Sequence, residues 1–318
     1  MAKKRVILVA FFLLLTITSL LIGVNSVVSI KNLFKGNKEA WNVLLASRMP
    51  RTVVIILAAS SLSIAGIIMQ SLSRNKFISP STAGTTDASA LGILISMLFI
   101  NSSNIYVKFI FAFVFALLAS FLFIFIINKI KFKNVVLIPL IGLMYGGLLS
   151  AISLLLAYET NMVQVLASLR VGSFSHIGVF NGTILLILIP PVILSYFYAN
   201  SFSIVSVGEE FAKNLGVNYK KILIIGLTIT SVISASTFII VGPLPFLGLI
   251  IPNIISMYYG DNIKKNLIDI ALFGSSFVLL NDIFSRVVIF PYEVSIGFTM
   301  GISGAIIFLT LIFKQVRK

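Results

Sequence analysis

Long apolar runs, each long enough to cross a lipid bilayer, constrain this chain more than any other feature. Of its 318 residues, 58% are hydrophobic and only 10% are charged, whereas soluble domains average about 25% charged residues. A helix needs about 20 apolar residues to cross a hydrocarbon core of roughly 30 Å. Because lipid offers no partner to backbone polar groups, helices are the expected spanning elements. The sequence therefore predicts an all-α polytopic membrane protein and excludes a soluble globular one.

Ten segments are predicted to span the membrane, within one transmembrane domain that covers residues 1–318. They are Val6–Ile30, Arg51–Leu72, Ala88–Ile100, Val107–Asn128, Asn134–Tyr158, Ile177–Tyr198, Lys221–Val241, Leu244–Tyr259, Asn266–Phe290 and Val294–Phe313. The third and eighth are short, and each follows a stretch rich in Pro and Gly, at Ser79–Gly84 and Gly242–Pro245. Interrupted helices often mark a transporter's pathway, but the same residues fit buried re-entrant turns equally well.

The positive charges predict the orientation. Cytoplasmic loops keep an excess of Lys and Arg, and most of the 24 Lys and Arg lie in connections on the same side as the N-terminus. We therefore expect both termini to be cytoplasmic. The outer stretch Lys31–Arg51 breaks the rule and invites a functional explanation. Although the net charge is +15, the basic residues are scattered between apolar runs, so membrane lipid rather than nucleic acid is the expected partner.

Residues suited to covalent chemistry or metal binding are scarce. The chain has no Cys, one His and nine Asp and Glu, which leaves few metal ligands and no thiolate. None of the 21 Gly is followed by Lys, so the sequence contains no phosphate-binding Walker loop. We expect no catalytic residue, no cofactor and no metal site. A partner protein would have to hydrolyse ATP.

The longest cytoplasmic connection contains a predicted short helix, at about residues 206–216. Ser206 and Glu209 match a capping box, and Gly216 suits the left-handed position after the helix. Phe211 and Leu215 give it an apolar face, and its acidic start would be repelled by anionic lipid headgroups. We therefore expect this helix to dock into a soluble partner rather than lie on the membrane. Its expected coupling residues are Ser206, Gly208, Glu209, Glu210, Phe211, Leu215 and Gly216.

Four motifs occur together and in order, at Arg48–Thr52, Met69–Asn75, Gly208–Val217 and Gly242–Leu249. Their joint occurrence resembles the FecCD-type permeases of ABC importers for iron-siderophores and vitamin B12. The resemblance implies ten helices in a bacterial inner (plasma) membrane. It also implies a second permease subunit, identical or different, two cytoplasmic ATP-binding subunits and an extracytoplasmic substrate-binding protein.

Two positions depart from that family's pattern. Asn253 follows Pro252 where many members have Pro-His, and Asp87 stands where a small or amide residue is common. The role of Asn253 stays open. Asp87 is expected to cap the third span at its inner end, with a place on the exit path as the weaker alternative.

Charged residues near the outer ends of the spans suggest a docking surface. Asp282 and Arg286 are four residues apart on one predicted helix, where they can form an ion pair. We expect Arg48, Arg51 and Arg286 to dock acidic residues of the binding protein. The alternative is that Arg48 and Arg51 contact lipid phosphates while Arg286 only neutralises Asp282.

The sequence therefore predicts a permease subunit, not an enzyme, of an ATP-binding-cassette importer for a ferric siderophore or related iron chelate. Import of cobalamin or haem would suit the same scaffold. A third hypothesis, an ion-coupled secondary transporter, requires intramembrane carboxylates as proton or ion relays. Asp282 is the one deep candidate, and its neighbour Arg286 argues against that role.

Overall fold

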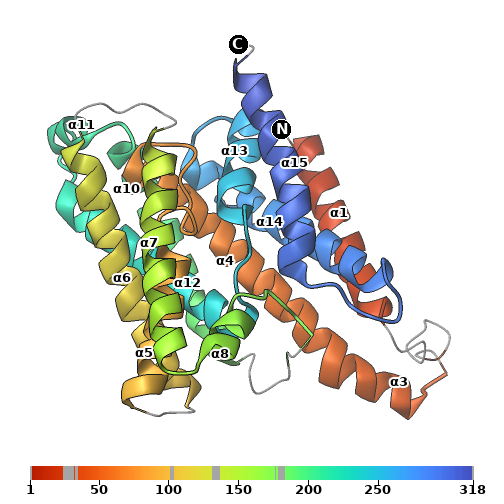
Figure 1. Ribbon diagram of the computed structural model, residues 1–318. Helices are drawn as coiled ribbons and strands as arrows, with labels where there is room; N and C mark the ends of the chain where they lie inside the picture. The colour runs from red at the N-terminus through yellow and green to blue at the C-terminus, as the bar shows by residue number, and fades with distance from the viewer. Residues whose placement is uncertain are drawn as a thin grey trace.

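The computed structural model describes residues 2–23, 32, 35–100, 104–130, 137–175, 177 and 183–316, which form helices joined by short connections (Figure 1). The helices are α1 (Ala2–Leu21), α3 (Lys38–Val43), the π-helix η1 (Leu44–Arg48), α4 (Met49–Ser73), α5 (Thr85–Phe99), α6 (Ile105–Lys129), α7 (Leu137–Glu159), α8 (Val163–Leu169), the 3-10 helix η2 (Thr183–Leu188), α10 (Ile189–Val205), α11 (Glu209–Asn214), α12 (Tyr219–Val241), α13 (Leu247–Tyr259), α14 (Ile263–Val287) and α15 (Ile296–Val316). The predicted all-α fold is confirmed.

Each predicted span corresponds to an apolar helix. Among the residues that the structure describes, eight helical segments are long and apolar enough to cross a membrane, and α5 and α13 are shorter apolar helices. These two are the third and eighth segments, as their lengths predicted. The predicted ends at Ile30 and Asn134 lie outside the described residues. The count of ten crossings stays a prediction.

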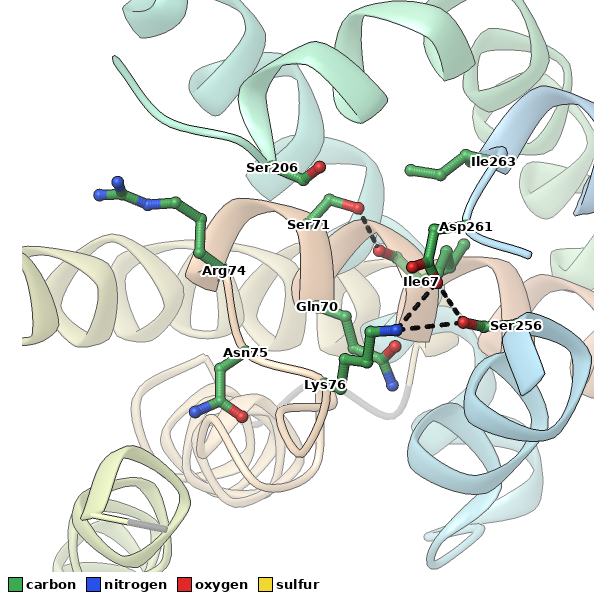
Figure 2. A pocket seen from close by; sticks show the side chains of 10 residues that line it. All are labelled: Ile67, Gln70, Ser71, Arg74, Asn75, Lys76, Ser206, Ser256, Asp261 and Ile263. Carbon is green, nitrogen blue, oxygen red and sulfur yellow. Dashed lines mark hydrogen bonds and ion pairs between the residues drawn. The ribbon is translucent and has the colours of Figure 1, made fainter. Parts of the chain in front are cut away.

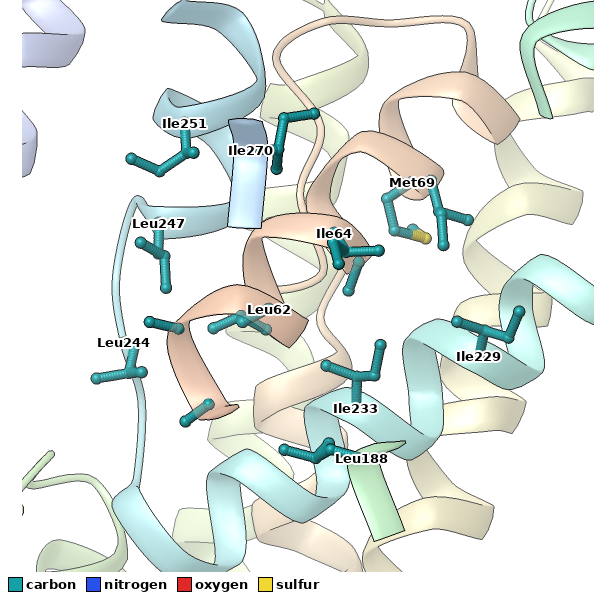
Figure 3. Close-up of a cluster of buried hydrophobic side chains, with 14 of the residues drawn as sticks. Leu62, Ile64, Met69, Leu188, Ile229, Ile233, Leu244, Leu247, Ile251 and Ile270 are labelled. Atoms are coloured by element: carbon teal, nitrogen blue, oxygen red, sulfur yellow. The ribbon is translucent and has the colours of Figure 1, made fainter. Parts of the chain in front are cut away.

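Helix α4 forms the centre of the protein. In the most apolar 18-residue stretch of each span, 72% of the residues are buried in the span that contains α4 and 67% in α12. The share is only 11% in α1 and 22% in α15. Helices α12, α13 and α14 all pack against α4, and Figure 3 shows their apolar side chains meeting around it. The buried residues drawn there include Leu62, Ile64, Met69, Ile229, Ile233, Leu247, Ile251 and Ile270.

Small residues bring the central helices into backbone contact. A Cβ atom on Gly66 of α4 would lie 2.0 Å from the carbonyl oxygen of Gly248 in α13. A Cβ on Gly274 of α14 would lie 2.1 Å from the Ser63 hydroxyl oxygen. Lipid is as apolar as the side chains, so membrane helices associate through such close packing rather than through the hydrophobic effect. Glycine at these contacts fixes how closely α13 and α14 approach α4.

The chain before α5 turns back into the protein as irregular backbone. Ile78 and Ala83 are fully buried there, and Gly84 begins α5 with a left-handed φ of +75°. The Thr85 hydroxyl donates to the Pro80 carbonyl at 2.7 Å. Irregular backbone is tolerated at membrane depth only where protein buries and satisfies it. This Pro/Gly-rich stretch therefore has the buried, hydrogen-bonded form expected of a re-entrant turn.

Side chains supply hydrogen-bond partners where Pro252 interrupts the hydrogen bonds of α13. Pro252 has no N–H to donate to the Gly248 carbonyl one turn earlier. The Gln70 amide of α4 lies 3.5 Å from that oxygen and 3.3 Å from the Leu249 oxygen. The Asn253 amide donates to the Lys76 carbonyl at 2.7 Å, so Asn253 ties α13 to the segment that precedes α5.

Replacing Gly66 with Ala should test the central contact. We expect Gly66→Ala to destabilise the protein by about 1–3 kcal/mol, because the new methyl group meets backbone that cannot move aside. Gly147→Ala is the matched control, since Gly147 is exposed on α7 and its Cβ would meet nothing within 4 Å. The measurement is the midpoint of thermal denaturation in detergent. Equal midpoints for the two variants would contradict the close packing of α4 and α13.

Candidate functional site

The predicted coupling segment forms the short helix α11 between α10 and α12. Figure 1 places it at the same end of the molecule as both chain termini. It is shorter than expected, because α10 continues to Val205 and α11 begins only at Glu209.

The expected capping box is wrong, whereas the expected end of the helix is confirmed. Ser206 ends α10, and its hydroxyl donates to the Ser203 carbonyl at 2.7 Å. The residue before α11 is instead Gly208, whose φ of 149° and ψ of 167° only glycine adopts readily. At the other end, Gly216 is left-handed with φ +73°. The Gly216 and Val217 N–H groups donate back into the last turn, at 2.9 Å each, as in a Schellman motif.

Charge and apolar surface are separated on α11. Glu209 and Lys213 form an exposed ion pair at 2.9 Å, and their hydrogen bond lowers the pKa of Glu209 and raises the pKa of Lys213. Phe211 and Leu215 are 46% and 54% exposed. Ala212 between them is buried against the protein. The exposed patch of two large apolar side chains lies outside the packed helices, where a soluble partner can reach it.

A pocket of about 190 Å³ lies between the end of α4 and the start of α14 (Figure 2). On its wall, Lys76 contacts Asp261 at 2.9 Å and Ser256 at 3.2 Å. Burial alone would raise the pKa of Asp261, but hydrogen bonds from Lys76 and Ser256 outweigh it and lower that pKa. Arg74, the left-handed residue that ends α4, also reaches Gly208, where its guanidinium lies 3.4 Å from the position of a Cβ. The end of α4 therefore contacts the turn that leads into α11.

At the opposite end, Asp282 is held by two guanidinium groups. Arg51 bonds one of its oxygens at 2.7 Å, and Arg286 bonds the other. Arg51 also grips both oxygens of Glu293, at 2.8 and 2.9 Å. Asp282 is completely buried, and Arg286 is 4% exposed. The predicted pairing of Asp282 with Arg286 is confirmed.

Arg48 and Arg286 also donate hydrogen bonds to the last carbonyl groups of α1. Arg286 donates to the carbonyls of Ser19 and Ile22, at 3.0 and 2.7 Å. Arg48 donates to Leu20 at 3.1 Å and to the next carbonyl as well. The last carbonyls of a helix have no partners within it and carry partial negative charge. Both arginines are therefore buried as caps of α1 rather than extended towards solvent.

The three predicted docking arginines nevertheless line one depression of about 250 Å³. The sequence reasoning missed Glu293 on its rim. Glu293 follows the turn after α14, where no spacing rule links it to Arg51, and only the fold brings the two together.

Asp87 lies in the first turn of α5, at the helix N-terminus that the sequence suggested, but it is not the N-cap residue. Gly84 rather than Asp87 is the N-cap of α5, and an Asp87 carboxylate oxygen lies 3.0 Å from the Cβ position of Gly146, near the middle of α7. Asp87 shares a pocket of about 230 Å³ with Arg170 and Pro243, which follow α8 and α12. The preceding segment enters the protein before α5 begins, so the first turn of α5, which carries Asp87, lies beside the middle of α7.

Comparison with known proteins identifies the family. The model of the FecCD transport family matches residues 6–314. The chain belongs to the FecCD transport family. Its members are permeases, and the apolar helices described above are consistent with a membrane permease.

Two curated relatives match nearly the whole chain. The petrobactin import system permease protein YclN of Bacillus subtilis is 46% identical over 303 residues, 95% of this chain and 96% of that protein. The ferric-anguibactin transport system permease protein FatD of Vibrio anguillarum is 39% identical over 311 residues, 98% of each. A solved structure of a putative metal-chelate type ABC transporter in an inward-facing conformation superposes with a TM-score of 0.81. It is 24% identical and covers 99% of this chain and 100% of that one, which supports the fold.

Removing the central carboxylate of the arginine cluster should destabilise the permease. Asp282→Asn leaves two guanidinium groups without their shared counter-charge, and losing one partner of a buried ion pair costs about 3–5 kcal/mol. Asp261→Asn is the matched control, because the pair with Lys76 is exposed and such pairs contribute about 0–1 kcal/mol. We expect the thermal midpoint in detergent to fall for Asp282→Asn and to change little for Asp261→Asn. Equal midpoints would contradict a structural role for the cluster.

Proposed function

We propose that this chain is the membrane subunit of an ATP-driven importer for a ferric siderophore or a related iron chelate. The observation that carries the proposal is that two full-length relatives are named for petrobactin import and ferric-anguibactin transport. The scarcity of catalytic and metal-binding residues in the chain fits a protein that moves a chelate without chemical change.

The rest of the importer would consist of a second permease subunit, two ATP-binding subunits and an extracytoplasmic binding protein. In this arrangement residues 1–318 form one membrane domain. The end that carries α11 and both termini faces the cytoplasm, in agreement with the positive charges of the connections. The arginine cluster then faces the outside, where the binding protein delivers its substrate.

Helix α11 would transmit the movement of the ATPases. Their closure on ATP binding displaces the exposed patch of Phe211 and Leu215. The contact of Arg74 with Gly208 passes this displacement to the end of α4. Because α4 packs against α13 at Gly66, a shift of α4 would change how α13 packs. A rigid-body change between two packings would switch access from one side of the membrane to the other.

Reconstitution tests the function and the coupling patch together. Uptake of a ferric siderophore, haem and cobalamin is measured in proteoliposomes with the binding protein, with or without the ATPase and ATP. We expect the ferric siderophore to enter only with both. Phe211→Asp should lower transport and transport-coupled ATP hydrolysis at least tenfold, because it buries an unpaired charge in the ATPase interface.

The matched control is Asn214→Asp, which adds the same charge at an exposed position of α11 but keeps the aromatic ring. It should retain most of the uptake. Transport without any ATPase would support an ion-coupled transporter instead, and normal coupling in Phe211→Asp would remove α11 from the ATPase interface.

We further infer that the depression between Arg48, Arg51 and Arg286 receives an acidic side chain of the binding protein. Among the described residues, three arginines and Glu293 line the depression, and Asp282 pairs with two of those arginines, which gives three guanidinium groups against two carboxylates. Arg48 and Arg286 are buried against α1, so Arg51, which pairs with Asp282 and Glu293 but has a 13% exposed side chain, is the arginine of the three that a partner reaches. Planar guanidinium groups bind carboxylates with two parallel hydrogen bonds.

Arg51→Gln should slow docking and weaken its dependence on salt, because charges at the rim of an interface act mainly on the association rate. We expect a loss of several-fold at low ionic strength that shrinks as salt is added, measured with immobilised permease and soluble binding protein. Lys38→Gln on nearby α3 removes the same charge from an exposed position and should have a smaller effect. Equal losses would indicate a general field rather than docking at the depression, and unchanged rates in Arg51→Gln would refute the contact.

A further inference from the structure

An apolar groove lies between α1, α13 and α14, at the same end of the protein as α11. Its volume is about 530 Å³, and its walls include Ile7 and Phe11 of α1, Ile254 and Tyr258 of α13, and Phe273 of α14. Ile7 and Tyr258 are 67% and 66% exposed, and Phe11 is 41% exposed. Helix α1 packs chiefly on α14, which leaves the space beside α13 open to the bilayer.

The mouth of the groove is positively charged. Lys4 is the one charged residue among its lining, and the ammonium nitrogen lies 5.8 Å from the centre of the Tyr258 ring. The neighbouring Arg5 is paired with Asp269 at 2.8 Å. Within the described part of the chain, no carboxylate forms an ion pair with Lys4. Its charge is therefore available to an anionic ligand.

We propose that this groove binds one anionic phospholipid, with the headgroup phosphate on Lys4 and an acyl chain along Ile7 and Phe11. From Lys4 to Phe11, α1 rises roughly 10 Å, the depth at which the upper part of an acyl chain runs. Tyrosine and lysine are typical of the boundary between headgroups and hydrocarbon. Anionic lipids are enriched in the cytoplasmic leaflet, the side that the proposed orientation gives to this groove.

The bound lipid would join two helices that otherwise share little surface. One wall belongs to α1, the least buried of the candidate spans. The other belongs to the last turns of α13, the helix whose first turn contacts α4 at Gly248. A lipid in the groove therefore supports α13 from the membrane side.

Tryptophan fluorescence can report occupancy of the groove directly. The chain has one Trp, so a Trp41→Phe, Tyr258→Trp double variant places the single fluorophore at the groove mouth. The full-length variant is reconstituted into symmetric vesicles of phosphatidylcholine with phosphatidylglycerol, one of the two brominated on its acyl chains. Because both leaflets have the same composition, the result does not depend on the orientation or on the transport function.

We expect brominated phosphatidylglycerol to quench the single tryptophan of this double variant with about fivefold greater apparent affinity than brominated phosphatidylcholine, the contribution of one lysine near an anionic headgroup. Lys4→Glu in the same background should abolish the preference. Lys129→Glu is the matched control, because that lysine also lies over an aromatic ring, Phe125, at 4.5 Å, but does not line this groove. It should leave the preference unchanged.

Three results would overturn the proposal. Equal quenching by the two lipids would mean ordinary contact with the bilayer, without selection of the headgroup. A preference that survives Lys4→Glu would assign the headgroup to another cation. Absence of quenching by either lipid would mean that another protein surface, such as a second permease subunit, covers the groove.

Discussion

The need to satisfy every backbone polar group without water determines how this permease can be built. Two of its helices, α5 and α13, begin with buried residues. Each start leaves N–H groups, and the irregular backbone before it leaves further polar groups, that lipid cannot bond. Side chains and irregular backbone supply the partners. The Gln70 amide donates to the Gly248 carbonyl, which Pro252 leaves without a backbone donor, and the Asn253 amide donates to the Lys76 carbonyl. The bonds from Gln70 require α4 and α13 to lie in contact, which explains why Gly66 of α4 faces Gly248 of α13.

The same constraint explains the arginines at the other end. An α1 span that is only 11% buried gains little from packing, and its last carbonyls have no partners within the helix. Arg48 and Arg286 provide those partners. Asp282 then balances Arg286 in a region where an isolated charge would be costly. The fold therefore accounts for Arg48 and Arg286, two of the outer charges that run against the positive-inside pattern, and we propose that Arg51 serves a partner as well.

Helices and the interactions within one helix were predictable from the sequence, whereas contacts between residues far apart in the chain were not. Apolar length located the helices, and the Asp282–Arg286 spacing predicted an ion pair because both lie on one helix. Gly216 was correctly placed because one residue determines the left-handed turn. The capping box at Ser206 failed because α10 continues further than its polar sequence suggested. The contact of Asp87 with α7 and the pair of Glu293 with Arg51 were missed because these neighbours come from other helices, which local pattern does not reveal.

The central position of α4 gives the two ends of the molecule a common mechanical element. Arg74 ends α4 beside the turn into α11, while Arg51 begins it within the outer cluster. A helix of 25 residues held at both ends moves as one body more readily than it bends. Its contact with α13 at Gly66 leaves no space to absorb a shift. In the proposed coupling, a displacement that enters at α11 would reach α13 and the outer ion pairs together, as alternating access requires.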